Sequence, residues 1–306
     1  MIGFTALAAL LAALGACAPA VTSCEPAEVV IETPVRVVAF CGAHPDDAAA
    51  PAIVASLAYD AGMYATAGPC NEPDATYSPA FTGQRYSDPA TYMRLVELNA
   101  SVGMKTVVFD ARLWSPEMAV RTEAINFWLP VIEHVFAWDM GDEFDPAGPE
   151  WDILVTRWNI VLAEATAVTG VKPFTNHLPW AVGHALDTLP GSDELLSFDK
   201  YDGDLGQLIA AQVNHRVQTL MCAVNVLQHG PFAVSEQSIR DAIAVLAAAG
   251  CDWFLAFGGA LPYAQPIEVD GERIFNPIPH FGDASLVNRY GAPTVWATAF
   301  KEATSS

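Results

Sequence analysis

Residues 135–146 read Val-Phe-Ala-Trp-Asp-Met-Gly-Asp-Glu-Phe-Asp-Pro, and this stretch decides the fold. An apolar run of the β type leads into a cluster of acids, and Pro146 then ends the strand. We therefore expect a buried strand whose carboxyl end carries Asp139, Asp142 and Glu143.

Acids beside Trp138 and Phe144 indicate chemistry on sugars. A carboxyl group among aromatic side chains loses solvent, so its pKa rises and it holds a proton near neutral pH. A neighbouring carboxyl group that stays in solvent remains ionised. The alternative is that Asp142, Asp145 or both only cap the helix that begins near Pro149.

The same pattern recurs on both sides of this stretch. Short apolar runs alternate with longer segments of helical spacing, which is typical of βα units around a parallel sheet. The expected strands cover residues 35–41, 63–68, 105–110, 135–146, 172–176, 195–201, 218–227 and 251–257. Helices are expected near residues 47–61, 89–103, 149–170, 205–213, 235–250 and 284–302, and a further helix is expected to begin at Ser115-Pro116. Asp270-Gly271 predicts a hairpin after the eighth strand.

Eight such units predict a single (β/α)₈ TIM barrel over residues 34–306. The other candidate is an open doubly wound sheet that binds a nucleotide. That fold places a glycine-rich phosphate loop after its first strand, and this chain has none there.

The charge of the chain excludes several classes of partner. Its 306 residues carry 35 acids against 14 bases, a formal net charge of −21. Such a surface repels phosphate backbones, so we expect no nucleic-acid partner. It also disfavours an anionic membrane surface unless a covalent anchor overrides the repulsion.

The amino terminus offers such an anchor. Residues 1–16 form an uncharged apolar run that ends in Leu14-Gly15-Ala16 before Cys17, which resembles the lipobox of bacterial lipoprotein signal peptides. The resemblance implies a removed signal, a lipidated Cys17 and a tether over residues 17–33. We therefore expect an exported protein, anchored by lipid or secreted.

The cysteines beyond Cys17 leave two arrangements open. Cys222 with Cys251, or Cys41 with Cys70, would form a disulfide in an oxidising compartment, and buried free thiols are the alternative. No CxxC spacing indicates a zinc site, and we expect no cofactor.

Polar and aromatic residues gather where the predicted strands end. In a barrel of this kind the site is built at the carboxyl ends of the strands. The expected catalytic residues are Glu143, Asp142 and Asp199, and the expected substrate-binding residues are His44, Asp110, Asp139, Asn176, His177, Trp180, Tyr201, Gln228 and Trp253. Acids and amides bond sugar hydroxyls while aromatic rings stack on sugar C–H faces, so this set predicts a neutral carbohydrate substrate.

On these residues the chain resembles the (β/α)₈ glycoside hydrolases whose acid/base is a Glu at the end of strand four. Gly141-Asp142-Glu143 also resembles the Gly-Asp-Glu of the β-hexosaminidases. The resemblance implies that Glu143 is the general acid and that Asp142 orients an acetamido group of the substrate.

The chain departs from this pattern at the seventh strand. Retaining members place a second Glu there, whereas this chain has Asn225 and Gln228. The second carboxylate would then be Asp199, whose distant strand predicts a wide carboxyl gap and an inverting mechanism, or Asp142 in a substrate-assisted one. A carbohydrate-binding barrel without hydrolysis is the alternative function.

Several of these residues have simpler interpretations. Asp46 and Asp47 are capping candidates, and Arg112 pairs with Asp110 or Asp142 as scaffold. Packing is the alternative for Trp180 and Tyr201, and a surface ion pair with Lys200 for Asp199. His44, His177 and His229 are the candidate ligands of a metal-dependent hydrolase, which the missing HxH and HExxH motifs disfavour.

Overall fold

The computed structural model of the chain divides into two units, Met1–Val30 and Ile31–Ser306. The residues that it describes all belong to the second unit. They are 36–40, 42–68, 88–142, 144–192, 195–198, 220–225, 235–248, 251, 253–257, 263–269, 272–277, 285–288 and 290–305. Among these residues, no helix has the length and apolar character needed to cross a bilayer.

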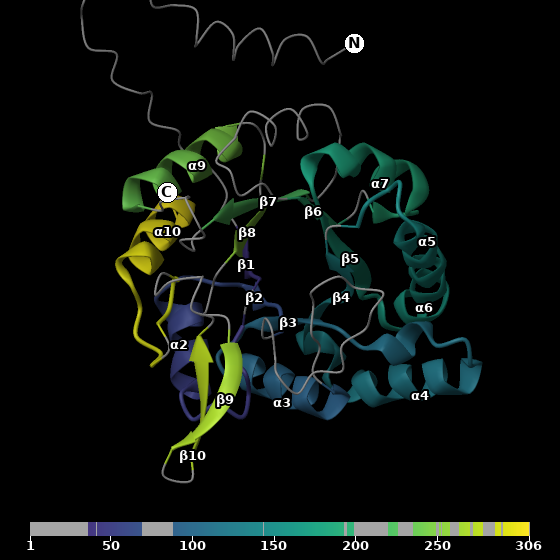
Figure 1. The fold of residues 1–306 in the computed structure, drawn as a ribbon, viewed down its shortest axis with the longest axis horizontal. Coiled ribbons are helices and arrows are strands. Elements are labelled where there is room, and N and C mark those ends of the chain that lie inside the picture. Colours follow the sequence, from purple (N-terminus) through teal and green to yellow (C-terminus); the bar gives the residue numbers. More distant parts are fainter. Residues whose placement is uncertain are drawn as a thin grey trace, which may run out of the picture. The chain divides into compact units, whose positions relative to one another are not determined.

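Eight parallel strands close into a barrel, which confirms the predicted fold (Figure 1). The strands are β1 Arg36–Ala39, β2 Ala65–Thr66, β3 Lys105–Val108, β4 Val135–Asp142, β5 Lys172–His177, β6 Leu196–Phe198, β7 Leu220–Asn225 and β8 Trp253–Phe257. Each strand pairs with the next, and β8 closes on β1 with Leu255 opposite Val38.

Helices surround the barrel (Figure 1). They are α2 Ala50–Tyr59, α3 Pro89–Ala100, α4 Met118–Trp128, α5 Pro149–Val161, α6 Ala167–Thr169, α7 Val182–Thr188, α9 Glu236–Ala248 and α10 Val295–Ser305. Tight 3₁₀ turns cover Ala111–Trp114 (η1), Leu129–His134 (η2) and Pro179–Ala181 (η4), and a π-helical turn, Leu162–Thr166 (η3), joins α5 to α6. The helix expected near residues 205–213 lies outside the described residues.

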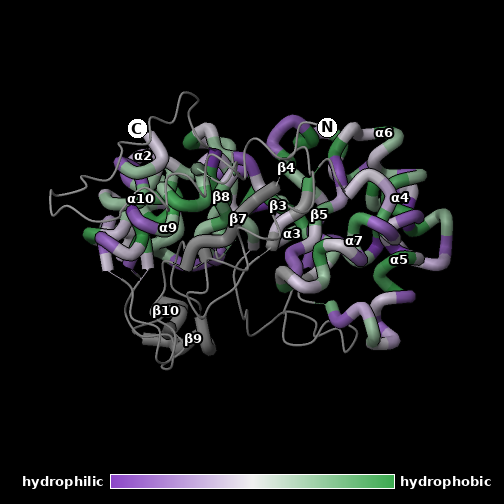
Figure 2. The backbone as a smooth tube through the Cα atoms, turned by 90° about the horizontal axis from the view of Figure 1, so that it is seen from above, coloured by the Kyte–Doolittle hydropathy of each residue, from purple (hydrophilic) through white to green (hydrophobic). Residues whose placement is uncertain are grey.

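The apolar core has two layers, because side chains alternate between the two faces of each strand. The inner layer comes only from strands and their ends, and it consists of Val38, Ala65, Ala67, Val107, Ala137, Phe174, Leu195 and Leu255. The outer layer joins strands to helices, for instance Trp138 of β4 to Trp128 of α4, whose ring centroids lie 6.3 Å apart. In Figure 2 the helices α4, α5 and α9 alternate between hydrophilic and hydrophobic segments, as helices with one buried face do.

Local sequence signals set several helix ends. Asp88 caps α3 as predicted, since its Oδ1 accepts the N–H groups of Ala90 and Thr91 at 2.8 and 3.1 Å. The hydroxyl oxygen of Ser235 likewise accepts the N–H of Ser238 in the first turn of α9, at 3.1 Å. Gly170 follows α6 with φ +74°, a conformation that favours glycine at a helix end.

Three expected helices begin later than the sequence indicates, and the first of them, α2, begins at Ala50 rather than near Asp47. The chain after β3 first forms η1, and α4 begins at Met118 rather than beside Pro116. The last helix begins at Val295 rather than near residue 284, because Asn288 closes a turn there. Its Oδ1 accepts the N–H groups of Tyr290 and Ala292, and Val287 bridges to Pro293.

The hairpin predicted after the eighth strand is confirmed. β9 Tyr263–Val269 and β10 Glu272–Pro277 pair antiparallel as a separate two-stranded sheet, with Val269 opposite Glu272 on the two sides of the turn.

Candidate functional site

The carboxyl end of β4 is irregular where its acids begin. Asp139 pairs with Phe174 of β5, but the next pair is Asp142 with Asn176, so β4 holds one extra residue between the two pairs. Gly141 has φ +117°, a backbone conformation that residues other than glycine rarely adopt. The strand therefore contains a β-bulge directly before Asp142.

Asp139 lies on the inner face of β4. Its neighbours Trp138 and Met140 both pack in the outer layer, so the alternation of side chains turns Asp139 into the barrel. Its Oδ1 accepts the N–H of Gly141 at 2.9 Å. Desolvation raises the pKa of the Asp139 carboxyl group to about 6, against the opposing effect of this hydrogen bond.

Two buried polar residues of β5 reach its neighbouring strands. The hydroxyl of Thr175 donates to the carbonyl oxygen of Gly141 in β4 at 2.9 Å. The next residue, Asn176, accepts the hydroxyl of Ser197 in β6. All three side chains are buried, so these contacts tie β4, β5 and β6 together at their carboxyl ends.

The side chain of His177 does not lie where the sequence predicts it, among the substrate-binding residues. It is fully buried, and its ring lies 5.5 Å from that of Trp151 in α5, so it faces the helices rather than the barrel interior. Neither ring nitrogen finds a hydrogen-bond partner among the residues that the structure describes. Burial lowers the pKa of the His177 imidazole to about 3, so the ring is neutral near pH 7.

Asp110 pairs with Arg112, which confirms the simpler interpretation of Arg112, and its expected role in substrate binding stays a prediction. Its carboxylate accepts the Nη2–H of Arg112 at 2.7 Å and the indole N–H of Trp128 at 2.9 Å. The side chain is 1% exposed. The carboxylate therefore joins η1 to α4 and is not presented to solvent.

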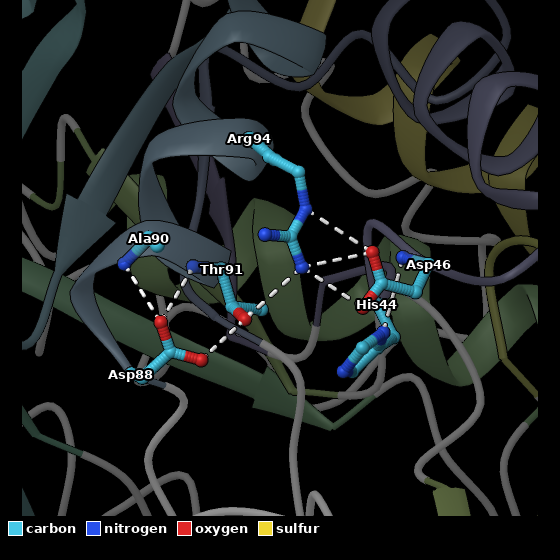
Figure 3. Close-up of polar contacts among 6 residues, drawn as sticks. All are labelled: His44, Asp46, Asp88, Ala90, Thr91 and Arg94. Carbon is cyan, nitrogen blue, oxygen red and sulfur yellow. Dashed lines mark hydrogen bonds and ion pairs between the residues drawn. The ribbon is translucent and has the colours of Figure 1, made fainter.

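A polar network links the loop after β1 to the start of α3 (Figure 3). The Arg94 guanidinium bonds both carboxylate oxygens of Asp46, at 2.9 Å each from Nη2. The same nitrogen reaches the hydroxyl of Thr91, which donates to Asp88 at 2.7 Å. This hydroxyl contact is the main cause that lowers the pKa of Asp88.

His44 joins the network through its Nδ1, which accepts the backbone N–H of Asp46 at 3.1 Å (Figure 3). An accepting Nδ1 carries no proton, so a neutral ring has its proton on Nε2. His44 is 1% exposed and follows β1, at the end of the barrel where the sequence analysis expects it.

Three of the acids that were candidates for helix capping have described side-chain partners. Asp46 pairs with Arg94, and Asp47 accepts the N–H of Ala49, which precedes α2. Helix α5 begins after Gly148 without a side-chain cap, and Asp145 accepts the N–H of Ala147 in the preceding turn. The capping interpretation is therefore wrong for Asp46 and Asp145, because both bond outside the first turn of a helix.

The two described aromatic candidates lie at opposite ends of the barrel. Trp180 is 62% exposed in η4, just after β5, so its ring is open to solvent at the carboxyl end. Trp253 is the first residue of β8 and pairs with Arg36, the first of β1. It stacks on Phe136 at 5.3 Å between ring centroids, which closes the amino-terminal end and corrects its expected place in a subsite.

Four predicted site residues lie outside the described residues: Glu143, Asp199, Tyr201 and Gln228. For Asp142 the structure describes the backbone, opposite Asn176.

Among the described residues, no three His, Cys, Asp or Glu side chains are grouped as metal ligands. Cys251 forms a disulfide bond, so the free-thiol alternative is wrong for this residue.

A hollow of about 760 Å³ lies on the outer flank, between η1 and α5. Trp114, Pro116, Ile153 and Arg157 are among its lining residues, and the Arg157 guanidinium lies 5.7 Å from the Trp114 ring. None of the predicted site residues lines this hollow, so we place the candidate site at the strand ends.

Two hydrogen bonds of the site were not predicted from the sequence. Asp139 was expected as a substrate-binding residue, and its bond to the N–H of Gly141 was not foreseen. Thr175, whose hydroxyl donates to the carbonyl oxygen of Gly141, was not singled out. A glycine inside a strand pattern indicates a bulge, so Gly141 was the available signal.

Comparison with known proteins finds solved structures of similar fold. No family model matches the chain, and no curated protein matches it. A GH5_18 structure from Streptomyces cattleya in complex with GlcNAc has a TM-score of 0.53 and 10% identity, covering 89% of this chain and 80% of that one. An endo-β1,6-glucanase has a TM-score of 0.51 and 10% identity, covering 94% and 80%. Because the identity is so low, the similarity shows that these structures share the barrel fold with this chain and shows nothing about its activity.

Proposed function

We propose that the chain is a glycoside hydrolase that cleaves an oligosaccharide or polysaccharide, with Glu143 as the general acid. The observation that carries the proposal is the bulged carboxyl end of β4, which holds the buried acid Asp139 and leads through Asp142 into Glu143. In the glycoside hydrolases that the sequence resembles, this strand end bears the acid/base. The two similar structures bear names of carbohydrate-related proteins, which agrees with the proposal.

Each side chain has a stated part in the proposed reaction. Glu143 protonates the leaving oxygen, and Asp142 or Asp199 assists the attacking water or the oxocarbenium-like transition state. Asn176 and His44 offer polar groups at the same end of the barrel, and the exposed Trp180 ring offers a surface for a sugar C–H face.

Hydrolysis of a panel of polysaccharides and aryl glycosides tests the proposal, with the full chain compared to Glu143→Gln. We expect turnover to fall at least about a hundredfold in the variant, the usual size of a general-acid contribution. Glu133→Gln is the matched control, because the Glu133 side chain is 81% exposed and Glu133 lies just before Val135, at the amino-terminal end of β4. Equal turnover in both variants would remove Glu143 from the mechanism.

A carbohydrate-binding protein without hydrolysis is the second candidate. β7 ends at Asn225, where retaining enzymes of the resembled group carry their nucleophilic Glu. No turnover by the full chain, together with saturable binding of a glycan from the panel, would establish this function instead.

We also propose that the chain is exported and anchored through lipid on Cys17. The apolar segment before Cys17 supports this, and so does the disulfide at Cys251, since such bonds persist in oxidising compartments. Labelled palmitate should enter the wild-type chain in a bacterial host and be absent from Cys17→Ser. Equal labelling of the two would exclude the anchor.

A further inference from the structure

The bulge in β4 determines which residue stands opposite Asn176. Counting from the pair Asp139 and Phe174, an unbroken ladder would bring Gly141 opposite Asn176. The extra residue brings Asp142 there instead, because a one-residue slip moves every later position of a strand. The position of the acidic segment thus depends on the bulge being held.

Two side chains hold the bulge from opposite sides of Gly141. The carboxylate of Asp139 accepts its N–H, and the hydroxyl of Thr175 donates to its carbonyl oxygen, each at 2.9 Å. Asp139 belongs to β4 itself, whereas Thr175 belongs to β5. Thr175 therefore adds a side-chain contact between the bulge and the neighbouring strand, beside the backbone pairing of the two strands.

We propose that Thr175 is a positioning residue, whose hydroxyl locks the β4 bulge and so fixes the backbone that leads into Asp142 and Glu143. Its effect on catalysis rests on the proposed function, but its effect on the backbone of Gly141 does not. Thr175 is fully buried, so its hydroxyl has no water to replace this partner. A β-branched side chain also has few χ1 rotamers, which keeps the hydroxyl aimed at Gly141.

Removal of the hydroxyl leaves the Gly141 carbonyl oxygen buried without this donor, which favours opening of the bulge. Opening also frees the Gly141 N–H from Asp139, although Thr175 does not touch that group. Exchange of the Gly141 amide hydrogen therefore reports on the lock, and a side chain that only fills space would not change it.

The test compares the full chain with Thr175→Val, which keeps the shape, and Thr175→Ser, which keeps the hydroxyl. Amide exchange is followed by NMR, with amides of β1 as the reference for global unfolding. We expect the Gly141 amide to exchange about tenfold faster in the valine variant, the effect of losing one buried hydrogen bond, and to recover in the serine variant. If the valine variant does not fold, Thr175→Ala and Thr175→Ser give the same comparison, since they differ only in the hydroxyl.

Activity separates this inference from the proposed function. In an active enzyme we expect kcat to fall about tenfold to a hundredfold in Thr175→Val with KM little changed, because the reacting acid is displaced while the sugar still binds. Gly141 exchange that is the same with and without the hydroxyl would overturn the inference, whatever the activity. Faster exchange in a chain that hydrolyses nothing would uphold the lock and refute only the proposed function.

Discussion

Replacement of His177 by Phe should change how stability depends on pH. The imidazole is buried against Trp151, and burial lowers its pKa from 6.5 to about 3. Between these values the unfolded chain binds a proton that the folded chain does not, so the wild type loses stability as the pH falls through this window. At about 1.4 kcal/mol per pKa unit, the full loss is roughly 5 kcal/mol.

The free energy of unfolding, measured with urea at pH 7, 6, 5 and 4 through tryptophan fluorescence, gives the comparison. Relative to wild type, His177→Phe should gain about 1.4 kcal/mol for each pH unit below 6.5, or roughly 3 kcal/mol by pH 4. Other groups titrate in both proteins, so they cancel in the difference.

His184→Phe is the matched control, because His184 contacts the same Trp151 ring at 4.9 Å between centroids but is exposed to solvent. A difference between His177→Phe and wild type that stays constant from pH 7 to pH 4 would refute the burial of a neutral His177.

Two further substitutions test the buried acids. Asp139→Asn should have the opposite effect: the carboxyl pKa is raised from 3.8 to about 6, so the stability it contributes is present below 3.8 and lost as the pH rises through 6. The asparagine variant should gain roughly 3 kcal/mol on wild type between pH 4 and pH 7, and an unchanged difference in urea unfolding would contradict the raised pKa. Asp110→Asn breaks a buried network and should cost about 3–5 kcal/mol, whereas Asp46→Asn breaks the exposed pair with Arg94 and should cost at most about 1 kcal/mol. Equal losses in thermal unfolding would show that burial does not separate the two pairs.

The fold was predictable because its signals are local. Alternation in β1 turns Val37 outward and Val38 inward, and Asp88 before Pro89 starts a helix wherever the helix packs. These effects depend on neighbouring residues of one segment, so they can be followed along the sequence. The eight βα units then leave few ways to close the sheet.

The site was less predictable because it depends on register between strands. Asn176 and His177 are adjacent in sequence, but only the pairing of β5 shows that Asn176 follows the inner face and His177 the outer. Trp253 lies inside the predicted strand 251–257. The observed strand β8 begins two residues later, so Trp253 is its first residue and lies at the amino-terminal end of the barrel. The partner of Gly141 comes from β5, which no pattern within β4 reveals.

The bulge in β4 allows this strand to lose one residue without a change in its pairing with β3. Loss of one codon among residues 139–141 would leave the pairing of Val107 with Ala137 and of Val108 with Trp138 as it is. It would also remove the extra residue of the bulge, so that Asp142 would stand opposite Asn176 in an unbroken ladder. A single in-frame deletion can therefore remove the bulge, and an insertion can restore it, while the strand pairings on both sides of it keep their register.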